Sequence, residues 1–421
     1  MRLHRTLLLV ICLGSMSARA GDDPLSLDEA VTRALEIAPQ VSAQVASVDA
    51  MRALAVSSGR LPDPELVVGV DNLPVNGPDA YSFTSDFMTM QKIGVMQQFP
   101  RAAKRKLQRE RADADASVAS AGLVEARLAI AREVAQAWIK RSTAQTSLDD
   151  LRGLESEVEL QATAARAAVS AGRGSTAEAL AAQAAVAQLH ARVLQMQGEA
   201  RQSAFELERW IDADARRPLA AVPSLDDLPT PPAALLTNVH QHGSLLPFES
   251  QIQVAKLDVD LARAERRPDW SAELSFARRG PDFSDMVSLE FRIGLPLFTK
   301  NRQDPVVSAK HAELRRLEAE REAEVRMHTA ELAQMITEWE QLGAQLEQYE
   351  NEILPLARER SRAALASYRA GRGDLRSALD AYAQQVEFIV EHAQLVNARG
   401  QAWAFLRYLG PEHLHALEVP R

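Results

Sequence analysis

The chain is built from two similar halves, and this duplication limits what it can fold into. The segment Ala171–Ser175 (Ala-Gly-Arg-Gly-Ser) returns as Ala370–Asp374 (Ala-Gly-Arg-Gly-Asp). Other positions return with it: Trp138 is matched by Trp339. A unit of this size is far longer than the roughly 20–50 residues of a solenoid repeat. The sequence therefore predicts a duplicated half-protein, whose fold is made by two related halves together.

Residues 1–20 have the pattern of a secretory signal peptide. Met1–Arg5 is basic, Thr6–Gly14 is apolar, and Ala18–Ala20 fits a small-x-small cleavage site. The single cysteine, Cys12, lies in the apolar part, where we expect an ordinary signal-peptide residue rather than a lipid anchor. The mature chain then has no disulfide and no thiolate metal site. The formal net charge is −9, and an acidic exported protein is a poor candidate for nucleic-acid binding.

Each half is predicted to contain a helix, a pair of strands, a long helix, a glycine turn and a return helix. We expect a first repeat over 21–217 and a second over 233–410, joined by a linker at 218–232 and followed by a tail at 411–421. In the first repeat we expect the strand pair at about 64–99, the long helix at 102–170 and the return helix at 175–211. In the second repeat we expect the strand pair at about 269–298, the long helix at 301–370 and the return helix at 375–409. The second strand of the first repeat is expected to begin near residue 83, and Pro355 is expected to kink the long helix of the second.

The expected helix lengths predict an antiparallel coiled coil. The long helices carry apolar residues at alternating three- and four-residue steps, which is heptad spacing. At 1.5 Å per residue each would be roughly 100 Å long. The two shorter helices of a repeat together have about as many residues as its long helix, so stacked end to end they would cover it. Such a rod would carry the strands at one end and the glycine turn at the other.

The strands alternate between apolar and polar residues. Trp270, Leu274 and Phe276 alternate with Ser271 and Ser275. This pattern fits a half-buried sheet, and it also fits the wall of a membrane barrel with an apolar outer face. After the signal peptide no apolar run reaches the roughly 18–20 residues of a spanning helix, so strands would have to make any membrane crossing. One chain supplies four strands and the smallest barrels have about eight, so a barrel requires a dimer with eight strands or a trimer with twelve.

The mature chain resembles the TolC-like outer-membrane efflux proteins over essentially its whole length. The resemblance lies in the duplication, the strand pairs, the two glycine turns, and the segments Gly94–Pro100 and Gly294–Phe298. Arg267–Trp270 and the segment from Asp285 to Gln303 most resemble the branch that serves heavy-metal exporters. The resemblance implies a mainly α fold with membrane β-structure: long antiparallel coiled-coil helices forming a periplasmic α-barrel, and four strands per chain of a shared twelve-stranded β-barrel. It also implies a homotrimer that docks a periplasmic adaptor and an inner-membrane pump, commonly of the resistance-nodulation-division type.

The same resemblance assigns roles to residues at and near the two turns. The turns are expected at the periplasmic tips, where the adaptor touches and the aperture opens. The tip residues are Gly172, Gly174, Ser175, Gly371, Gly373 and Asp374. The family's acidic aperture positions align with Ser377 and Asp380, of which Ser377 is not acidic, and Glu178 lies near the other tip. The acidic residues also suit helix N-termini, where they would complement the helix dipole.

The remaining candidates favour no chemistry. His240 and His242, like His413 and His415, are spaced at i, i+2 without a carboxylate or thiolate partner, so we expect solvated loop histidines and no metal site. No nucleophile–base pair or phosphate-binding loop is recognisable, so we expect neither an enzyme nor a cofactor. Two alternatives remain open for the chain: a periplasmic coiled-coil adaptor or structural protein, and a conduit for type I protein secretion.

Overall fold

The computed structural model describes residues 23–415, without the side chains of His413 and His415. The expected signal peptide, with Cys12, and the end of the expected tail lie outside the described residues. Within them, no helix combines the length and the apolar character needed to cross a membrane.

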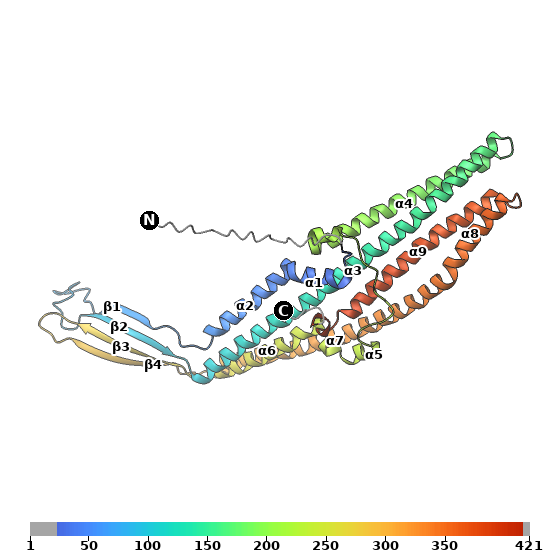
Figure 1. Cartoon of the computed structure of the whole chain (residues 1–421). Helices are drawn as coiled ribbons and strands as arrows, with labels where there is room; N and C mark the ends of the chain where they lie inside the picture. Colours follow the sequence, from blue (N-terminus) through green and yellow to red (C-terminus); the bar gives the residue numbers. More distant parts are fainter. Residues whose placement is uncertain (1–22, 416–421) are drawn as a thin grey trace, which may run out of the picture. The chain divides into compact units, whose positions relative to one another are not determined.

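Long helices dominate the chain (Figure 1). The α-helices are α1 (Leu27–Ile37), α2 (Pro39–Ser57), α3 (Ala102–Ser170), α4 (Thr176–Ile211), α5 (Pro232–Thr237), α6 (Leu246–Ala264), α7 (Gln303–Gln348), α8 (Leu354–Arg369), α9 (Leu375–Arg407) and α10 (Glu412–His415). The 3-10 helices are η1 (Asp212–Arg216), η2 (Val239–Gln241), η3 (Gly243–Leu245) and η4 (Thr299–Asn301), and η5 (Tyr349–Ile353) is a π-helix. The predicted fold class, mainly α with four strands, is confirmed.

The strands β1 (Glu65–Asp71), β2 (Met90–Phe99), β3 (Trp270–Arg278) and β4 (Met286–Ile293) form one antiparallel sheet in sequence order. The two strand pairs of the repeats meet between β2 and β3, where Val95 lies opposite Leu274. The prediction that β2 begins near residue 83 was wrong. Residues 72–89 form a loop instead, because Asn72 and Tyr81 adopt left-handed backbone angles and the Thr89 hydroxyl donates to the Asn72 carbonyl.

The expected irregularity at Pro355 takes the form of a π-helical turn. Proline has no N–H to donate to the carbonyl four residues earlier, at Asn351, so a regular α-helix cannot continue there. The π-helix η5 absorbs the mismatch between α7 and α8.

The described chain divides into two compact units. The first contains 23–34, 133–226 and 342–401, and the second contains 35–132, 227–341 and 402–415. Each unit therefore takes segments from both predicted repeats. The reason is that the long helices extend beyond one unit, so the halves of the sequence do not coincide with compact units in space.

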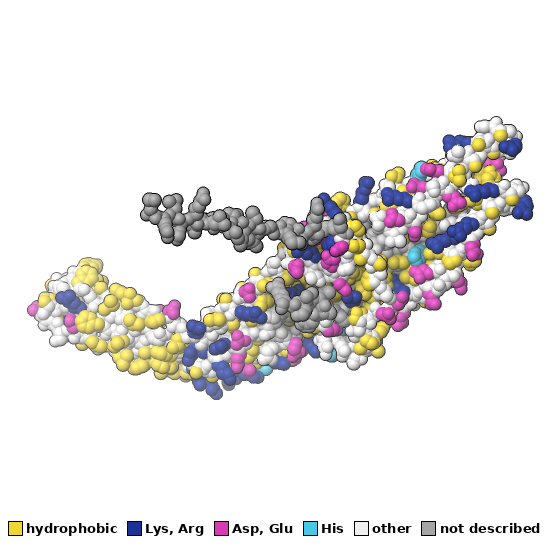
Figure 2. Space-filling view, in the orientation of Figure 1, with side chains coloured by type: hydrophobic (Ala, Val, Ile, Leu, Met, Phe, Trp, Pro, Cys, Tyr) yellow, Lys and Arg dark blue, Asp and Glu magenta, His cyan; other side chains and the backbone are white. Residues whose placement is uncertain are grey.

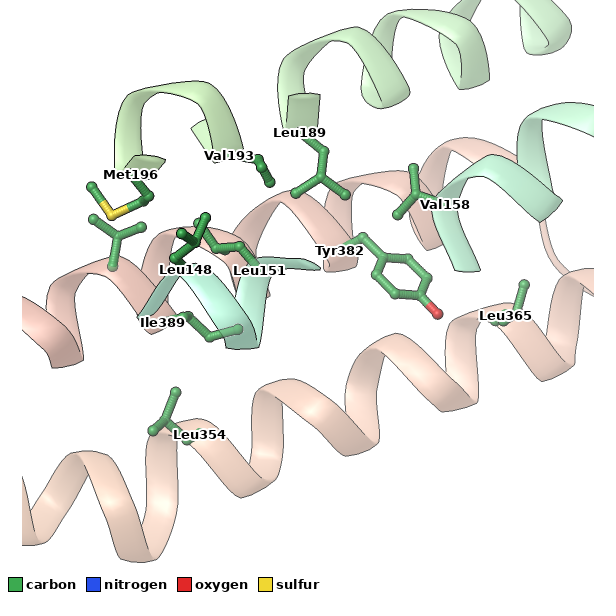
Figure 3. Packing of buried hydrophobic residues seen from close by; sticks show 11 residues of the cluster. Leu148, Leu151, Val158, Leu189, Val193, Met196, Leu354, Leu365, Tyr382 and Ile389 are labelled. Carbon is green, nitrogen blue, oxygen red and sulfur yellow. The ribbon is translucent and has the colours of Figure 1, made fainter. Parts of the chain in front are cut away.

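One hydrophobic cluster in the core of the first unit is built from side chains of four helices (Figure 3). Leu151 of α3 is fully buried there, and Val193 of α4, Leu354 of α8 and Ile389 of α9 belong to the same cluster. Tyr382 is the one aromatic residue among the buried members, and burial together with Glu157 raises the pKa of its hydroxyl. Small aliphatic side chains thus hold the two helical hairpins together.

Replacing Leu151 by Ala is expected to remove about 2–5 kcal/mol from the free energy of unfolding, because the lost side chain leaves a cavity between four helices. Leu160→Ala is the matched control, since Leu160 lies on the same helix but is 57% exposed. Its effect is expected to be within about 0.5 kcal/mol. Denaturant titration of both variants measures the difference, and equal losses would contradict the packing described.

Candidate membrane sheet and hairpin turns

One face of the sheet is apolar and exposed across all four strands. Val68, Ile93, Phe276 and Val287 lie opposite one another in register, and each is more than 40% exposed. A parallel row consists of Leu66, Val95, Leu274 and Leu289, which are likewise exposed. Figure 2 shows hydrophobic side chains gathered over the strands. A soluble monomer rarely leaves so continuous an apolar surface in water.

The other face of the sheet carries charges in a connected network. Glu273 forms an ion pair with Lys92 Nζ at 2.6 Å and accepts a hydrogen bond from Arg292 Nη2 at 2.9 Å. Arg292 also donates to Glu290 at 2.7 Å. The period-two pattern of the strands therefore separates an apolar face from a polar one, as the alternation in the sequence predicted.

Both outer edges of the sheet lack a strand partner within the described chain. The order is β1-β2-β3-β4, so one edge of β1 and one edge of β4 leave backbone N–H and C=O groups unpaired. All eight residues of β4 are exposed. Strands of another chain could pair with these two edges, and the exposed apolar face needs an apolar environment to cover it.

Both glycine turns close in the same way. Gly172 and Gly371 have φ of 68° and 69°. After Gly172, the N–H of Arg173 donates to the Ala168 carbonyl at 2.9 Å; after Gly371, the N–H of Arg372 donates to Ser367 at 2.9 Å. This is the Schellman arrangement, which satisfies the last carbonyls of a helix and needs a left-handed residue.

The second glycine of each turn is needed for space rather than for its backbone angle. A Cβ on Gly174 would lie 2.9 Å from the Val169 nitrogen, whereas a Cβ on Gly172 would meet nothing within 4 Å. A Cβ on Gly373 would lie 2.8 Å from the Ser367 hydroxyl. The sequence predicted these glycines as a group but not this division between them.

The residues that follow the turns cap the return helices. The Ser175 hydroxyl accepts from the Ala177 N–H at 3.2 Å, and the Glu178 carboxylate accepts from the Ser175 N–H at 3.3 Å, which together make a capping box. In the second turn the Asp374 carboxylate accepts from the Ser377 N–H at 2.6 Å. That bond lowers the pKa of Asp374. Ser175 and Asp374 therefore perform one capping task with different charge.

The two hairpins lie side by side near their turns. Ala182 of α4 and Leu375 of α9 are fully buried in one small cluster, which also contains Ala162 and Ala165 of α3. Asp380 is exposed and lines a groove of about 780 Å³ between α4 and α9, where Arg192 and Glu387 form an ion pair at 2.9 Å. Asp380 and Ser377 belong to one hairpin, whereas Glu178 belongs to the other.

One expectation about the histidines was wrong. His242 is not solvated: it is 3% exposed and hydrogen-bonded to His328 at 2.9 Å. Burial, and then the neighbouring His328 ring, lower the pKa of His242 from 6.5 to about 4. No local pattern indicates this pair, because His328 lies 86 positions away on α7. His240 is exposed, and no cluster of three metal-binding side chains occurs among the described residues.

Residues 240–409 match the model of the outer membrane efflux protein family. The crystal structure of CusC, described as forming a transmembrane channel, is 16% identical, covers 91% of this chain and 92% of its own, and has a TM-score of 0.77. VceC from Vibrio cholerae is 18% identical over 93% and 95%, with a TM-score of 0.74. MtrE from Neisseria gonorrhoeae is 18% identical over 91% and 89%, with a TM-score of 0.72.

The chain has the fold of these three solved structures. No curated protein sequence matches it. The part that matches the family model includes β3, β4 and the second glycine turn.

The contrast between the turn glycines leads to a prediction for Gly371. Gly371→Asn is expected to be mild, because asparagine tolerates a left-handed backbone, whereas Gly371→Val is expected to cost about 1–3 kcal/mol in backbone strain. Hydrogen exchange of the amides at the end of α8 measures the loss of local stability. Equal exchange in the two variants would contradict the role assigned to the positive φ.

Proposed function

We propose that this protein is the outer-membrane exit duct of a tripartite efflux system, conducting solutes passively from an inner-membrane pump to the outside. The observation that carries the proposal is the four-stranded sheet with one exposed apolar face and two unpaired edges. In lipid, the apolar face would be solvated by acyl chains, and the edges would have to pair, since unpaired backbone groups are costly there.

Completing the sheet requires further copies of the chain. β4 of one copy would pair with β1 of the next, because these strands have the unpaired edges. Four strands per chain give eight in a dimer and twelve in a trimer, and either number is allowed for a barrel. The resemblance to the TolC-like outer-membrane efflux proteins favours the trimer. In this assembly the charged network of Lys92, Glu273 and Arg292 would face the lumen.

The helical hairpins would lie in the periplasm. The proposal places the adaptor at the turns, with Gly172, Gly174, Ser175, Gly371, Gly373 and Asp374 as the tip residues and a resistance-nodulation-division pump as the further partner. One feature supports this: in each turn the last carbonyls of the helix are satisfied by the backbone N–H groups of the turn itself. The aperture residues would be Asp380 and Ser377, with Glu178 on the neighbouring hairpin.

Heavy-metal cations are the cargo we favour, on the resemblance of Arg267–Trp270 to that branch of the family. Asp269 in this motif has a structural task in the chain: its carboxylate accepts from the Arg101 N–H at 3.0 Å and from Lys104 at 2.8 Å. These bonds tie the motif, which lies at the start of β3, to the start of α3. The metal sensitivity of a deletion strain tests the cargo separately from the channel.

The proposal predicts a membrane-inserted oligomer whose apolar face touches lipid. Val287→Arg is expected to abolish membrane insertion and the heat-sensitive oligomer on gels, because arginine at the bilayer midplane costs about 2–4 kcal/mol per chain. Ser288→Arg is the matched control, since Ser288 is the next residue of β4 and lies on the polar face. Membrane fractionation and gel migration with and without heating measure both variants.

A soluble wild-type monomer in that experiment would contradict the channel and favour the alternative of a periplasmic adaptor or structural coiled coil. A wild-type oligomer in the membrane whose deletion blocks export of a protein, but not efflux of small solutes, would favour the type I secretion conduit.

Asp380 is expected to form a ring of three carboxylates in the trimer, and such a ring favours cations. Asp380→Asn is expected to lower the ratio of cation to anion permeability in single-channel recordings. Asp374→Asn is the control, because asparagine preserves the helix cap while removing the same charge. Unchanged selectivity in Asp380→Asn, or an equal change in both variants, would overturn the aperture role.

A further inference from the structure

Two histidines from distant parts of the chain face each other inside the second unit. Nδ1 of His242 and Nε2 of His328 are 2.9 Å apart, and the rings meet edge to face at 88°. The residues are 3% and 6% exposed. At this distance one nitrogen has to donate a proton and the other has to accept it, because two facing N–H groups repel each other.

His242 belongs to the short irregular segment between α5 and α6, made of η2 and η3. Two hydrogen bonds hold this segment in place, and the backbone at Gly243 packs closely against α3. The His242 ring bonds to α7, the Gly243 N–H donates to the Leu409 carbonyl at 2.8 Å, and a Cβ on Gly243 would lie 2.6 Å from the Leu128 side chain of α3. Only the first contact depends on a group that titrates.

A cavity of about 240 Å³ beside the pair is lined by ionisable groups from each neighbouring element. α3 contributes Glu125 and Arg132, α7 contributes Glu324 and Glu331, and the end of α9 is followed by Tyr408. Burial and the Glu324 carboxylate raise the pKa of Glu125.

Glu331 Oε2 lies 3.8 Å from Nδ1 of His328. A proton on that nitrogen is favoured by the carboxylate, which leaves Nε2 of His328 to accept from Nδ1 of His242.

We propose that the His242–His328 contact is an acid-sensitive latch, which fastens residues 239–245 to α7 while the facing nitrogens share one proton and releases them when both are protonated. A second proton turns the hydrogen bond into a contact between two N–H groups and places two cations in a buried site. The carboxylates that line the cavity can accept hydrogen bonds from the protonated rings, which stabilises the released state. The latch is independent of the channel function proposed above.

Hydrogen exchange of the full-length protein tests the latch directly. The pKa of His242 is about 4 in the folded chain and 6.5 when exposed. The latch therefore contributes stability above pH 6.5 and loses it as the pH falls toward 4. At pH 4.5, after correction for intrinsic rates, exchange of the backbone amides of 239–245 is expected to be on the order of 10- to 100-fold faster than at pH 7.5.

The double variant His242→Gln/His328→Gln is expected to lack this pH step, because glutamine can hydrogen-bond but does not titrate. His240→Gln is the matched control: His240 is exposed, lies in the same segment and should leave the step unchanged. Amides in the core of the first unit, around Leu151, should show no step in any of these proteins.

A step that persists in the double variant, or disappears in His240→Gln, overturns the latch. So does a loss of protection that spreads uniformly over the chain at pH 4.5. If the double variant does not fold, His242→Phe retains an aromatic ring but removes the group whose pKa is lowered, and a pH step of wild-type size in that variant overturns the latch as well.

Discussion

A helix with a narrow apolar seam is stable only where another helix covers that seam, and this requirement governs the helical part of the chain. α3 spans 69 residues, and its buried residues Leu151 and Val158 pack against side chains of α4 and α9. Aromatic residues make up only 5% of the chain, so alanine and leucine allow the helices to approach closely. Covering a seam from end to end requires the chain to reverse within a few residues, and that is why each turn contains a glycine at positive φ.

The sequence predicts most where the cause of a structure is local. Continuous helix from Ala102 to Ser170 follows from a stretch without proline and rich in helix formers, and the turns follow from their glycines. The start of β2 was misplaced because the apolar residues Phe83 and Phe87 imitate a strand while lying in a loop. The histidine pair was missed because both the burial of His242 and its partner depend on packing between distant segments, which local spacing does not encode.

The two turns show how similar backbones tolerate different side chains. In the first turn, Ser175 and Glu178 together form a capping box at the start of α4. In the second turn, the Asp374 side chain accepts from the Ser377 N–H at the start of α9. Glu178 lies in the first turn of α4 and Asp374 immediately precedes α9, so both solutions place a negative charge near a helix N-terminus, where the dipole favours it. The sequence indicated that these residues suit helix N-termini, and the hydrogen bonds identify which groups are satisfied. Their use as caps limits how freely the same carboxylates could serve any other purpose.

The mixed origin of the compact units has a consequence for how such a chain could have arisen. The first unit joins Leu151 from one repeat to Ile389 from the other in a single core. A half-length ancestor could not have buried this layer alone and would have needed a second copy to complete it. A fusion of two copies through residues 218–232 makes their association intramolecular. Each half then meets the other at an effective concentration on the order of millimolar. The linker would then have fixed a stoichiometry, and the two copies were free to diverge thereafter.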